Sequence, residues 1–346
     1  MMRQLLCKRC GRAHRLPVID VGLTYQDTTC DDDRIPINVI SGFLGAGKTT
    51  LMNHILSHPT RERVDVLIRE FGKEAVDDQL VKFVSGNTHV FPGISMHDDP
   101  QLLLHDFLHD LACNEETEPF DRLLLETSGL DRPESIVQMF MIGYIPQHYR
   151  LGSCIVVVDA QYGLLSLEEY EVARHQVAYA DAIVINKMDL AEQEEVELLE
   201  KTLRKINPMA KIHQCSFGQV DLRSVLNIEL YGQLKELEQN EGAASVYGIQ
   251  TVVLSENKPL DKEKVNHWIN ELFENTGAKI LRGKGFLYFE GEDWRYEFQS
   301  VRKSFHSKAD RCWEEGEARK STIVLIGENL PDEKELRASF AACAAV

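Results

Sequence analysis

The sequence predicts an α/β fold with a mostly parallel, doubly wound sheet, followed by a smaller α+β domain. Short apolar runs typical of buried parallel strands alternate with helical stretches over the first two thirds of the chain. Beyond residue 245, several strand-like segments follow one another closely, with one helical segment among them and another at the end. The runs expected to form the parallel sheet are residues 37–40, 64–68, 122–125, 154–158 and 182–185.

The helical segments are predicted from apolar residues at helical spacing. Residues 50–57 form one amphipathic segment, and residues 191–206 place Val196, Leu199, Leu203 and Ile206 on one face. The second domain is expected to contain strands 247–255, 278–282, 285–290, 294–301 and 322–326, with helices 261–275 and 332–343. We therefore divide the chain into an N-terminal segment 1–35, a first domain 36–240 and a second domain 245–346.

A glycine-rich stretch follows the first predicted strand and precedes a helix. Gly42, Gly47, Lys48 and Thr49 match the pattern G-x-x-x-x-G-K-[ST], in which glycines let backbone N–H groups converge on phosphate oxygens at a helix N-terminus. The lysine reaches the β- and γ-phosphates, and the threonine hydroxyl binds Mg²⁺. The residues expected to hold the nucleotide phosphates are Gly45, Ala46, Gly47, Lys48, Thr49 and Thr50.

Composition and charge exclude several classes of protein. The formal net charge is −17, which argues against a nucleic-acid or anionic-membrane surface. No run of about eighteen apolar residues suggests a transmembrane helix, and the first ten residues lack the apolar core of a signal peptide. We expect a cytoplasmic protein whose eight cysteines are mostly reduced.

Acidic residues follow the second and third predicted strands. Glu126 comes directly after strand 122–125, the Walker-B arrangement, which places its carboxylate in the Mg²⁺ shell and leaves the Gly129 N–H to meet the γ-phosphate. Glu70 opens the polar segment 70–77, where a γ-phosphate-sensing switch is expected. Glu70 is a candidate to hold Mg²⁺ or the attacking water, with a solvated loop carboxylate as the alternative. The catalytic candidates are Lys48, Glu70 and Glu126.

The tetrad Asn-Lys-Met-Asp follows the strand at 182–185 and predicts the base. The Asp189 carboxylate can accept hydrogen bonds from N1–H and the exocyclic amine of guanine, whereas adenine offers neither there. If binding of the wrong base leaves a buried carboxylate unpaired, the preference is roughly a thousandfold. Asn186 is expected to connect the tetrad to the phosphate loop, and the Lys187 stem to lie along the base. The sequence thus favours GTP over ATP.

The first 35 residues contain a candidate zinc site. Cys7 and Cys10 form a C-x-x-C-G turn, with His14 and Cys30 as third and fourth ligands. A redox pair or ordinary reduced thiols are the alternatives. In addition, His105 and His109 lie one helical turn apart near the His-Asp-Asp stretch at 97–99, which makes either a nitrogen and oxygen metal cluster or an ordinary surface face.

These motifs, in this order, carry a family resemblance. The segments 42–50, 70–72, 126–130 and 186–189, followed by Lys-Gly at 284–285 and Ile-Gly at 326–327, resemble the CobW-type GTP-binding proteins. These proteins are relatives of the nickel-inserting GTPases of urease and hydrogenase maturation. The resemblance implies a P-loop NTPase fold and a slow, Mg²⁺-dependent GTPase, often active with a partner or on self-association. It also implies delivery or insertion of a metal, or a role in cobalamin-related metabolism.

The chain departs from the family pattern at two places. The family's C-x-C-C metal motif is missing, because the matching segment 85–90 contains no cysteine and only His89 as a metal ligand. The switch begins with Arg69 where the family usually has asparagine.

Three functional hypotheses remain open at this point. The first is a metallochaperone or insertase-like factor, in which GTP hydrolysis moves residues 70–90 and a client protein receives the metal. The second is a regulatory GTP switch for a partner enzyme, such as a corrinoid-dependent methyltransferase, without metal transfer. The third is a protein that sequesters zinc through residues 7–30 and uses nucleotide to gate assembly.

Overall fold

The computed structural model describes most of the chain in two compact units. It covers residues 34–58, 62–69, 88–91, 100–113, 119–140, 145–228, 244–274, 279–301 and 303–345, with the antiparallel two-residue strands β1 (Leu5–Leu6) and β2 (Ala13–His14). Of the residues 34–345, the first unit takes those up to 200 and residues 210–228. The second unit takes residues 201–209 and those from 244 onward.

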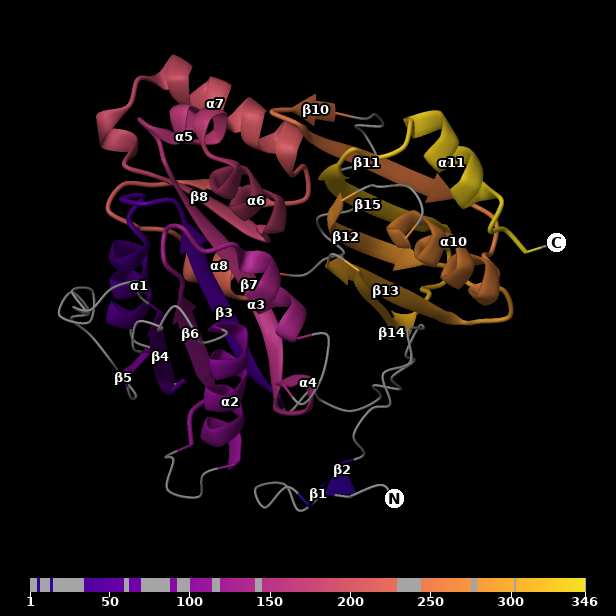
Figure 1. The fold of residues 1–346 in the computed structure, drawn as a ribbon, viewed down its shortest axis with the longest axis horizontal. Coiled ribbons are helices and arrows are strands. Elements are labelled where there is room, and N and C mark those ends of the chain that lie inside the picture. Colours follow the sequence, from indigo (N-terminus) through magenta and orange to yellow (C-terminus); the bar gives the residue numbers. More distant parts are fainter. Residues whose placement is uncertain are drawn as a thin grey trace. The chain divides into compact units, whose positions relative to one another are not determined.

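The first unit is built on a seven-stranded sheet in which every pairing is parallel (Figure 1). The strand order is β5-β4-β6-β3-β7-β8-β9. In this sheet the chain goes from β3 to β4 and then outward to β5. It returns to β6, which lies between β4 and β3, and then crosses to the other side of β3 at β7 and continues through β8 to β9. The strands are β3 (Ile35–Gly42), β4 (Val64–Arg69), β5 (Thr88–Phe91), β6 (Arg122–Glu126), β7 (Tyr149–Asp159), β8 (Ala182–Asn186) and β9 (Lys211–Gln214). Such a reversal of strand order opens a ligand crevice at the carboxyl ends of the central strands.

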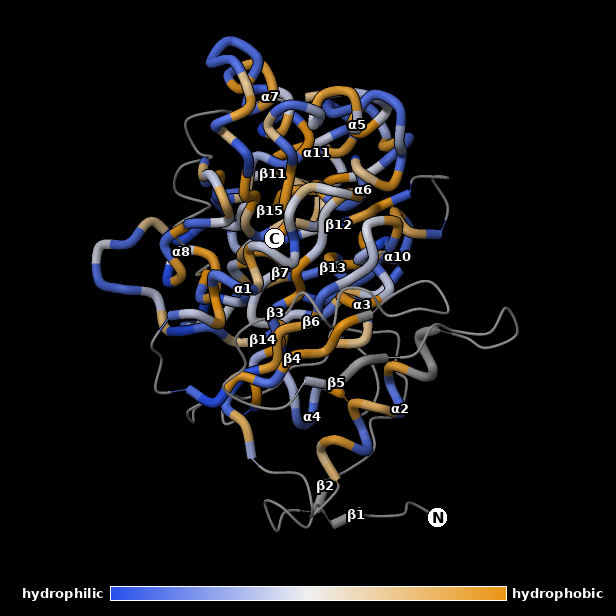
Figure 2. Tube along the Cα trace, turned by 90° about the vertical axis from the view of Figure 1, so that its left-hand side faces the viewer, coloured by the Kyte–Doolittle hydropathy of each residue, from blue (hydrophilic) through white to orange (hydrophobic). Residues whose placement is uncertain are grey.

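Helices cover both faces of this sheet, so its central strands are buried on both sides. The helices α1 (Lys48–Ser57) and α8 (Leu222–Leu226) share one apolar cluster with side chains of β3, β4, β6, β7 and β8. The helix α6 (Glu171–Tyr179) also contacts β3 and β7. One strand can contact helices on both faces, because successive side chains along a strand point to opposite faces of the sheet. The other helical segments are α2 (Pro100–Cys113), α3 (Pro133–Met139), α4 (Ile145–His148), α5 (Gly163–Glu169), the 3₁₀ turn η2 (Met188–Leu190) and α7 (Gln193–Ile206). In Figure 2 the tube is largely hydrophobic along β4 and β6, as expected for strands between two helical layers.

The second unit contains a six-stranded antiparallel sheet of order β10-β11-β15-β12-β13-β14 (Figure 1). Its strands are β10 (Ala244–Val246), β11 (Ile249–Glu256), β12 (Lys279–Leu287), β13 (Trp294–Val301), β14 (Ser304–Cys312) and β15 (Ser321–Glu328). The helices α10 (Lys262–Glu274) and α11 (Glu333–Ala341) share one core cluster with alternate residues of the strands. The rings of Trp268 and Phe340 pack 5.2 Å apart between the two helices.

The structure confirms the predicted fold class and the strands expected from apolar runs, but it corrects three assignments. The segments 278–282 and 285–290, predicted as two strands, form mainly one strand, β12, which passes through two glycines. The strand expected at 247–255 begins at Ile249, because Tyr247 and Gly248 have φ angles of 50° and 83° and form a two-residue hairpin turn. The strands β1, β2, β5, β9, β10 and β14 were not predicted. The domain boundary placed at residues 240–245 lies largely outside the described residues and stays a prediction.

Candidate functional site

The glycine-rich loop between β3 and α1 requires glycine at two positions, because a different neighbouring residue leaves no space for a side chain at each. Gly42 has a φ of 139°, and a Cβ atom there would lie 2.2 Å from the backbone oxygen of Val157 on β7. Gly47 has a φ of 103°, and its Cβ would lie 2.3 Å from the side-chain nitrogen of Asn186. Because neither contact can accommodate a side chain, the loop lies directly against the carboxyl ends of β7 and β8.

The loop leads into a helix whose N-terminus faces the crevice. Gly47 is the N-cap of α1 and provides no side-chain cap, which suits a helix N-terminus that binds phosphate through its backbone N–H groups. Lys48 begins the helix, and its Nζ donates to the backbone oxygen of Phe43 at 3.3 Å, across the loop. Ala46 is buried, whereas Gly45 and Thr50 are exposed at the loop surface.

A hydroxyl and a carboxylate meet beside this helix N-terminus. The Thr49 Oγ1 atom donates to Glu126 Oε1 at 2.9 Å, although the two residues are 77 positions apart. They meet because β3 and β6 are parallel neighbours whose register pairs Ile40 with Glu126. Glu126 is only 3% exposed. Two hard oxygen donors at the mouth of a phosphate loop fit Mg²⁺, which takes such donors together with water and phosphate oxygens.

The loop after β6 is closed by its own hydrogen bonds and packs on the phosphate loop. The Ser128 N–H donates to Asp131 Oδ2 at 3.1 Å, and the Asp131 N–H donates to the Ser128 carbonyl at 3.0 Å. A Cβ atom on Gly129 would lie 2.7 Å from the backbone nitrogen of Leu44. The Gln176 side chain of α6 donates to the carbonyls of Gly129 and Asp131 at 3.1 and 3.0 Å. The loop is therefore tied to α6 as well as to the phosphate loop.

Asn186, at the end of β8, joins the phosphate loop to the base-binding loops. Its Nδ2 donates to the Ala46 carbonyl at 3.1 Å, and its Oδ1 accepts from the Gly218 N–H at 3.0 Å. The Cys215 thiol also donates to Oδ1, at 3.6 Å. Burial raises the pKa of the Cys215 thiol, so the thiol stays protonated and remains a donor at neutral pH.

The remaining tetrad residues lie at the rim of the site. Lys187 has a left-handed backbone with φ of 64°, and its Nζ forms an ion pair with Asp159 Oδ2 at 2.7 Å. The Asp189 N–H donates to Ser216 Oγ at 3.2 Å, while the Asp189 side chain is exposed. The sequence argument assumed a buried carboxylate, and the structure corrects it: the bound base itself would have to bury Asp189.

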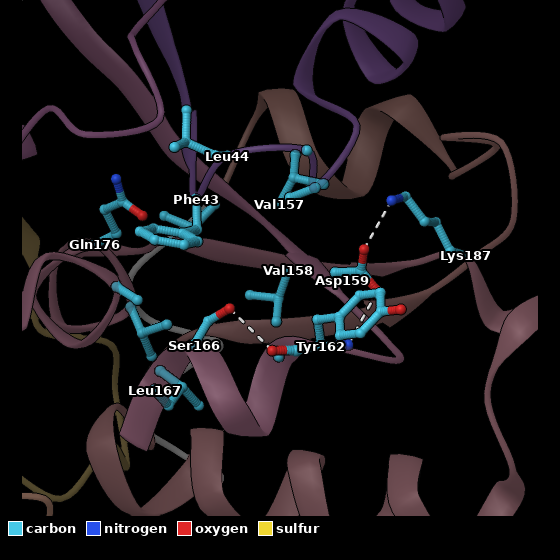
Figure 3. A pocket seen from close by; sticks show the side chains of 16 residues that line it. Phe43, Leu44, Val157, Val158, Asp159, Tyr162, Ser166, Leu167, Gln176 and Lys187 are labelled. Atoms are coloured by element: carbon cyan, nitrogen blue, oxygen red, sulfur yellow. Dashed lines mark hydrogen bonds and ion pairs between the residues drawn. The ribbon is translucent and has the colours of Figure 1, made fainter. Parts of the chain in front are cut away.

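A pocket of about 330 Å³ lies beside the phosphate loop and opens between β7, α5 and α6 (Figure 3). Apolar residues from the loop, the end of β7 and the two helices form most of its wall, and the Lys187–Asp159 pair lies at one side. Asp159 also accepts from the backbone N–H groups of Gln161 and Tyr162 at 2.9 and 3.2 Å. The side chain of Gln176 lines the pocket as well.

Asp159 and Gln176 were not among the predicted site residues. For Asp159 a signal was present, because it follows the apolar strand 154–158 directly, as Glu126 follows strand 122–125. Gln176 lies in the middle of a helix and had no such signal.

Several predicted residues fall outside the described part of the chain. These are Glu70 and the zinc candidates Cys7, Cys10 and Cys30; of His14 and His89 only the backbone is described, in β2 and β5. The structure places His105 and His109 on α2, each within 3.6 Å of the aspartate that follows it. Among the described residues, neither histidine belongs to a cluster of three close metal ligands.

None of the described helices combines the length and apolar character needed to cross a bilayer.

Two family descriptions match the chain. Residues 36–214 match the CobW/HypB/UreG nucleotide-binding domain, and residues 249–344 match the cobalamin synthesis protein cobW C-terminal domain. Each match lies over one of the two sheets described above.

Characterised relatives extend over nearly the whole chain. The zinc chaperone YjiA of Escherichia coli is 33% identical over 89% of this chain and 98% of its own length. The zinc-regulated GTPase metalloprotein activator 1 of Dictyostelium discoideum is 25% identical over 74% of this chain and 63% of its own length. A crystal structure of Zn(II)-bound YjiA GTPase from E. coli superimposes with a TM-score of 0.67 at 30% identity, covering 90% of this chain and 99% of that one. The chain therefore belongs to the CobW/HypB/UreG family of P-loop GTPases, whose site takes GTP with Mg²⁺.

Proposed function

We propose that this GTPase is a nucleotide-gated metallochaperone, which holds a divalent metal and releases it to a client protein as GTP is hydrolysed. The observation that carries the proposal is the continuous link from the phosphate loop through Gly129 and Gln176 to α6. The similarity of the chain to a zinc chaperone and to a zinc-regulated GTPase metalloprotein activator supports zinc as the metal. We further propose a cytoplasmic protein that acts with a client and self-associates.

In this proposal, specific residues of this chain bind the phosphates, the base and the Mg²⁺ ion. The backbone from Gly45 to Thr50 and the Lys48 ammonium hold the phosphates, while Asn186, Lys187 and Asp189 hold guanine. Thr49 and Glu126 hold Mg²⁺, which when bound neutralises charge on the phosphate oxygens. Lys48 and Glu126 are the catalytic candidates in the described region, and Glu70 is proposed to orient the attacking water.

Turnover is expected to be slow without a partner. Fast phosphoryl transfer depends on an added cation such as an arginine finger. Among the residues that line the described pocket, Lys187 is the cationic one, and it is already paired with Asp159. Arg69 or a partner protein is proposed to supply the missing charge.

The nucleotide state is proposed to be read by the loop 127–131. Loss of the γ-phosphate changes what the Gly129 N–H can bind, and this loop is held by Gln176 and followed by α3. The segment 70–90 is proposed to move at the same time. The two helices α3 and α6 contact one another, so both respond to a displacement of the loop.

Metal analysis of the purified full chain tests this function. Zinc bound per chain is measured after equilibration with Mg²⁺ and either GDP or a non-hydrolysable GTP analogue. We expect at least one equivalent of zinc whose affinity differs about tenfold or more between the two nucleotides, since allosteric coupling is typically 1–3 kcal/mol. Zinc that binds identically with both nucleotides would contradict gating and would point to a structural zinc site, such as Cys7, Cys10, His14 and Cys30.

The principal alternative is a regulatory GTP switch for a partner enzyme without metal transfer. The absence of cysteine from residues 85–90 favours it, since a soft thiolate trap for zinc is missing from that segment. Under this alternative the chain captures a partner in one nucleotide state and carries no exchangeable metal. A zinc-sequestering role through residues 7–30 predicts instead bound zinc that is not passed on.

A further inference from the structure

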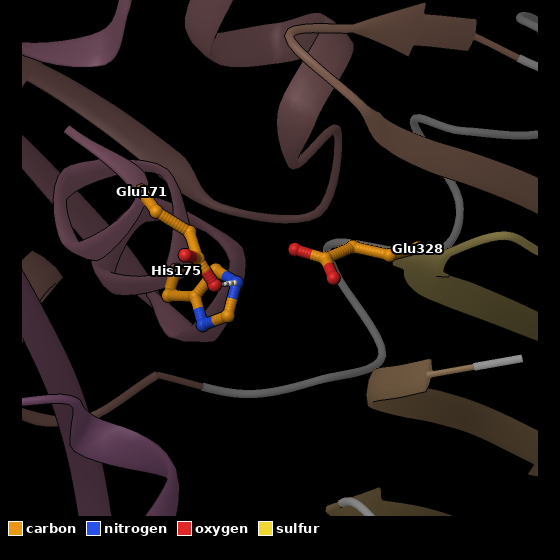
Figure 4. Close-up of side chains that lie close together, drawn as sticks. All are labelled: Glu171, His175 and Glu328. Atoms are coloured by element: carbon orange, nitrogen blue, oxygen red, sulfur yellow. Dashed lines mark ion pairs between the residues drawn. The ribbon is translucent and has the colours of Figure 1, made fainter. Parts of the chain in front are cut away.

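A histidine on α6 lies between two carboxylates. His175 is 3% exposed; its Nε2 lies 3.4 Å from Glu171 Oε1, and its Nδ1 lies 3.9 Å from Glu134 Oε1. Figure 4 shows Glu171 and His175 on consecutive turns of α6 with their ion pair drawn. The Glu134 side chain belongs to α3 and is 2% exposed, whereas that of Glu171 is 45% exposed.

This arrangement resembles half of a metal site. Residues four apart on a helix point to the same side, so the Glu171 carboxylate and the His175 Nε2 atom can bind one ion. Metal-binding histidines commonly donate their other ring N–H to a carboxylate, which orients the ring and raises its basicity. Glu134 lies on that side of the ring. We propose that His175 and Glu171 bind a divalent transition metal, zinc or a metal of similar preference, and that Glu134 is a positioning residue.

One cation competes for this site. The Arg132 guanidinium lies 3.2 Å from Glu171 Oε1, the same oxygen that faces His175. Both side chains of that pair are 45% exposed, and exposed ion pairs contribute little to stability. A bound metal ion therefore displaces Arg132 at small cost, and removal of Arg132 is expected to strengthen metal binding.

The buried carboxylate distinguishes this pair from another one in the chain. His267 and Glu271 on α10 have the same spacing, with Nε2 and Oε1 3.5 Å apart, but their side chains are 77% and 58% exposed. An exposed pair without an orienting carboxylate should bind metal no better than free imidazole and carboxylate. Within the described part of the first unit, the His175 site offers two ligands, Glu171 and His175, which leaves positions open for water or for an acceptor's ligands. Such incomplete coordination suits a metal that is handed on.

The nucleotide site is connected to both sides of the proposed metal site. Gln176, next to His175, donates to the carbonyls of Gly129 and Asp131, and α3, which carries Glu134, begins two residues after Asp131. A displacement of the loop 127–131 would therefore alter the distance between His175 and Glu134. This coupling rests on the proposed function, whereas the metal site itself rests on the geometry.

Competition for zinc with a chromogenic chelator tests the site in the full chain. We expect Glu171→Gln and His175→Asn each to weaken one zinc equivalent at least tenfold, and Glu134→Gln to weaken it about 10- to 100-fold, the range for carboxylates behind metal-bound histidines. Arg132→Ala should strengthen it. His267→Asn is the matched control and should bind as the wild type does. With Co²⁺ as a probe, the lost equivalent should lack the thiolate charge-transfer band of a cysteine site.

Glu171→Gln is the decisive variant, because Glu171 is half-exposed and plays no part in the nucleotide site. It should hydrolyse GTP at the wild-type rate. If Glu171→Gln and His175→Asn both keep every zinc equivalent at wild-type affinity, the site is overturned. If zinc binding depends on these residues but does not respond to nucleotide, the site stands and the gating function is contradicted.

Discussion

Replacing Asp189 by asparagine is expected to change the base preference from guanosine to xanthosine nucleotides. The carboxylate accepts two hydrogen bonds from guanine, whereas an asparagine amide donates to the 2-oxo group of xanthine. A hydrogen bond to a charged group contributes about 1.5–3 kcal/mol, and a site with an unpaired polar group rejects the mismatched ligand. The preference for GTP over XTP should therefore fall about 100- to 1,000-fold and reverse.

The exposed position of Asp189 makes this substitution a clean test. Among the described residues, no structural contact of the Asp189 carboxylate would be broken by asparagine, since the hydrogen bond to Ser216 comes from the Asp189 backbone. Affinities for fluorescent GDP and XDP analogues measure the change. Tight XDP binding by the variant shows that it is folded, so the variant carries its own control. An unchanged preference for GDP would contradict the role of the tetrad.

Replacing Lys48 by alanine is expected to abolish tight GTP binding. The Lys48 ammonium lies within the phosphate loop, 3.3 Å from the Phe43 carbonyl, at the position where the motif places a lysine that reaches the β- and γ-phosphates. Loss of one or two charge-assisted hydrogen bonds, at about 1.5–3 kcal/mol each, weakens affinity by roughly two orders of magnitude or more. Isothermal titration with GTP analogues and Mg²⁺ measures the loss.

The matched control for this substitution is Lys205→Ala. Lys205 is an exposed lysine on α7, and its removal changes the net charge of the protein equally. It should leave GTP affinity unchanged, which separates a specific phosphate contact from a general effect of charge. Normal GTP affinity in the Lys48 variant would refute the assignment of the loop.

The central part of the fold could be predicted from the sequence because burial on both faces produces continuous apolar runs. The strands at 37–40, 122–125 and 182–185 each have a parallel neighbour on both sides and are fully buried in the structure. The strands β9 and β14 consist mostly of polar residues and are only partly buried. They contain neither an apolar run nor a clear alternation of apolar and polar residues, so they were missed.

Strand β12 was divided in the prediction because glycine normally ends or weakens a strand. In the structure the two glycines at 283 and 285 lie where neighbouring strands approach closely. A Cβ atom on Gly285 would lie 2.1 Å from the Thr322 carbonyl, and one on Gly283 would lie 2.3 Å from the Ser300 hydroxyl. The glycines therefore permit strand packing here, which depends on partners far away in sequence.

The candidate site shows the same division between local and distant information. The sequence placed Glu126 and Asn186 at strand ends, and the structure brings them to Thr49 and Ala46. Their roles in catalysis and base binding stay predictions. Gln176 and His175 were missed because their importance depends on contacts with Gly129 and Glu134, more than 40 residues away. No local pattern of residue types reports such contacts.

The most direct test of the account is a single-turnover measurement of zinc release and phosphate release in the same sample. The zinc-loaded full chain is mixed with GTP and Mg²⁺, and a chromogenic zinc indicator is followed together with a phosphate sensor. The account predicts that zinc appears at the rate of phosphate release, and that Glu126→Gln slows both processes by the same factor. Zinc release that is equally fast with a non-hydrolysable GTP analogue, or that is absent after hydrolysis, would contradict it.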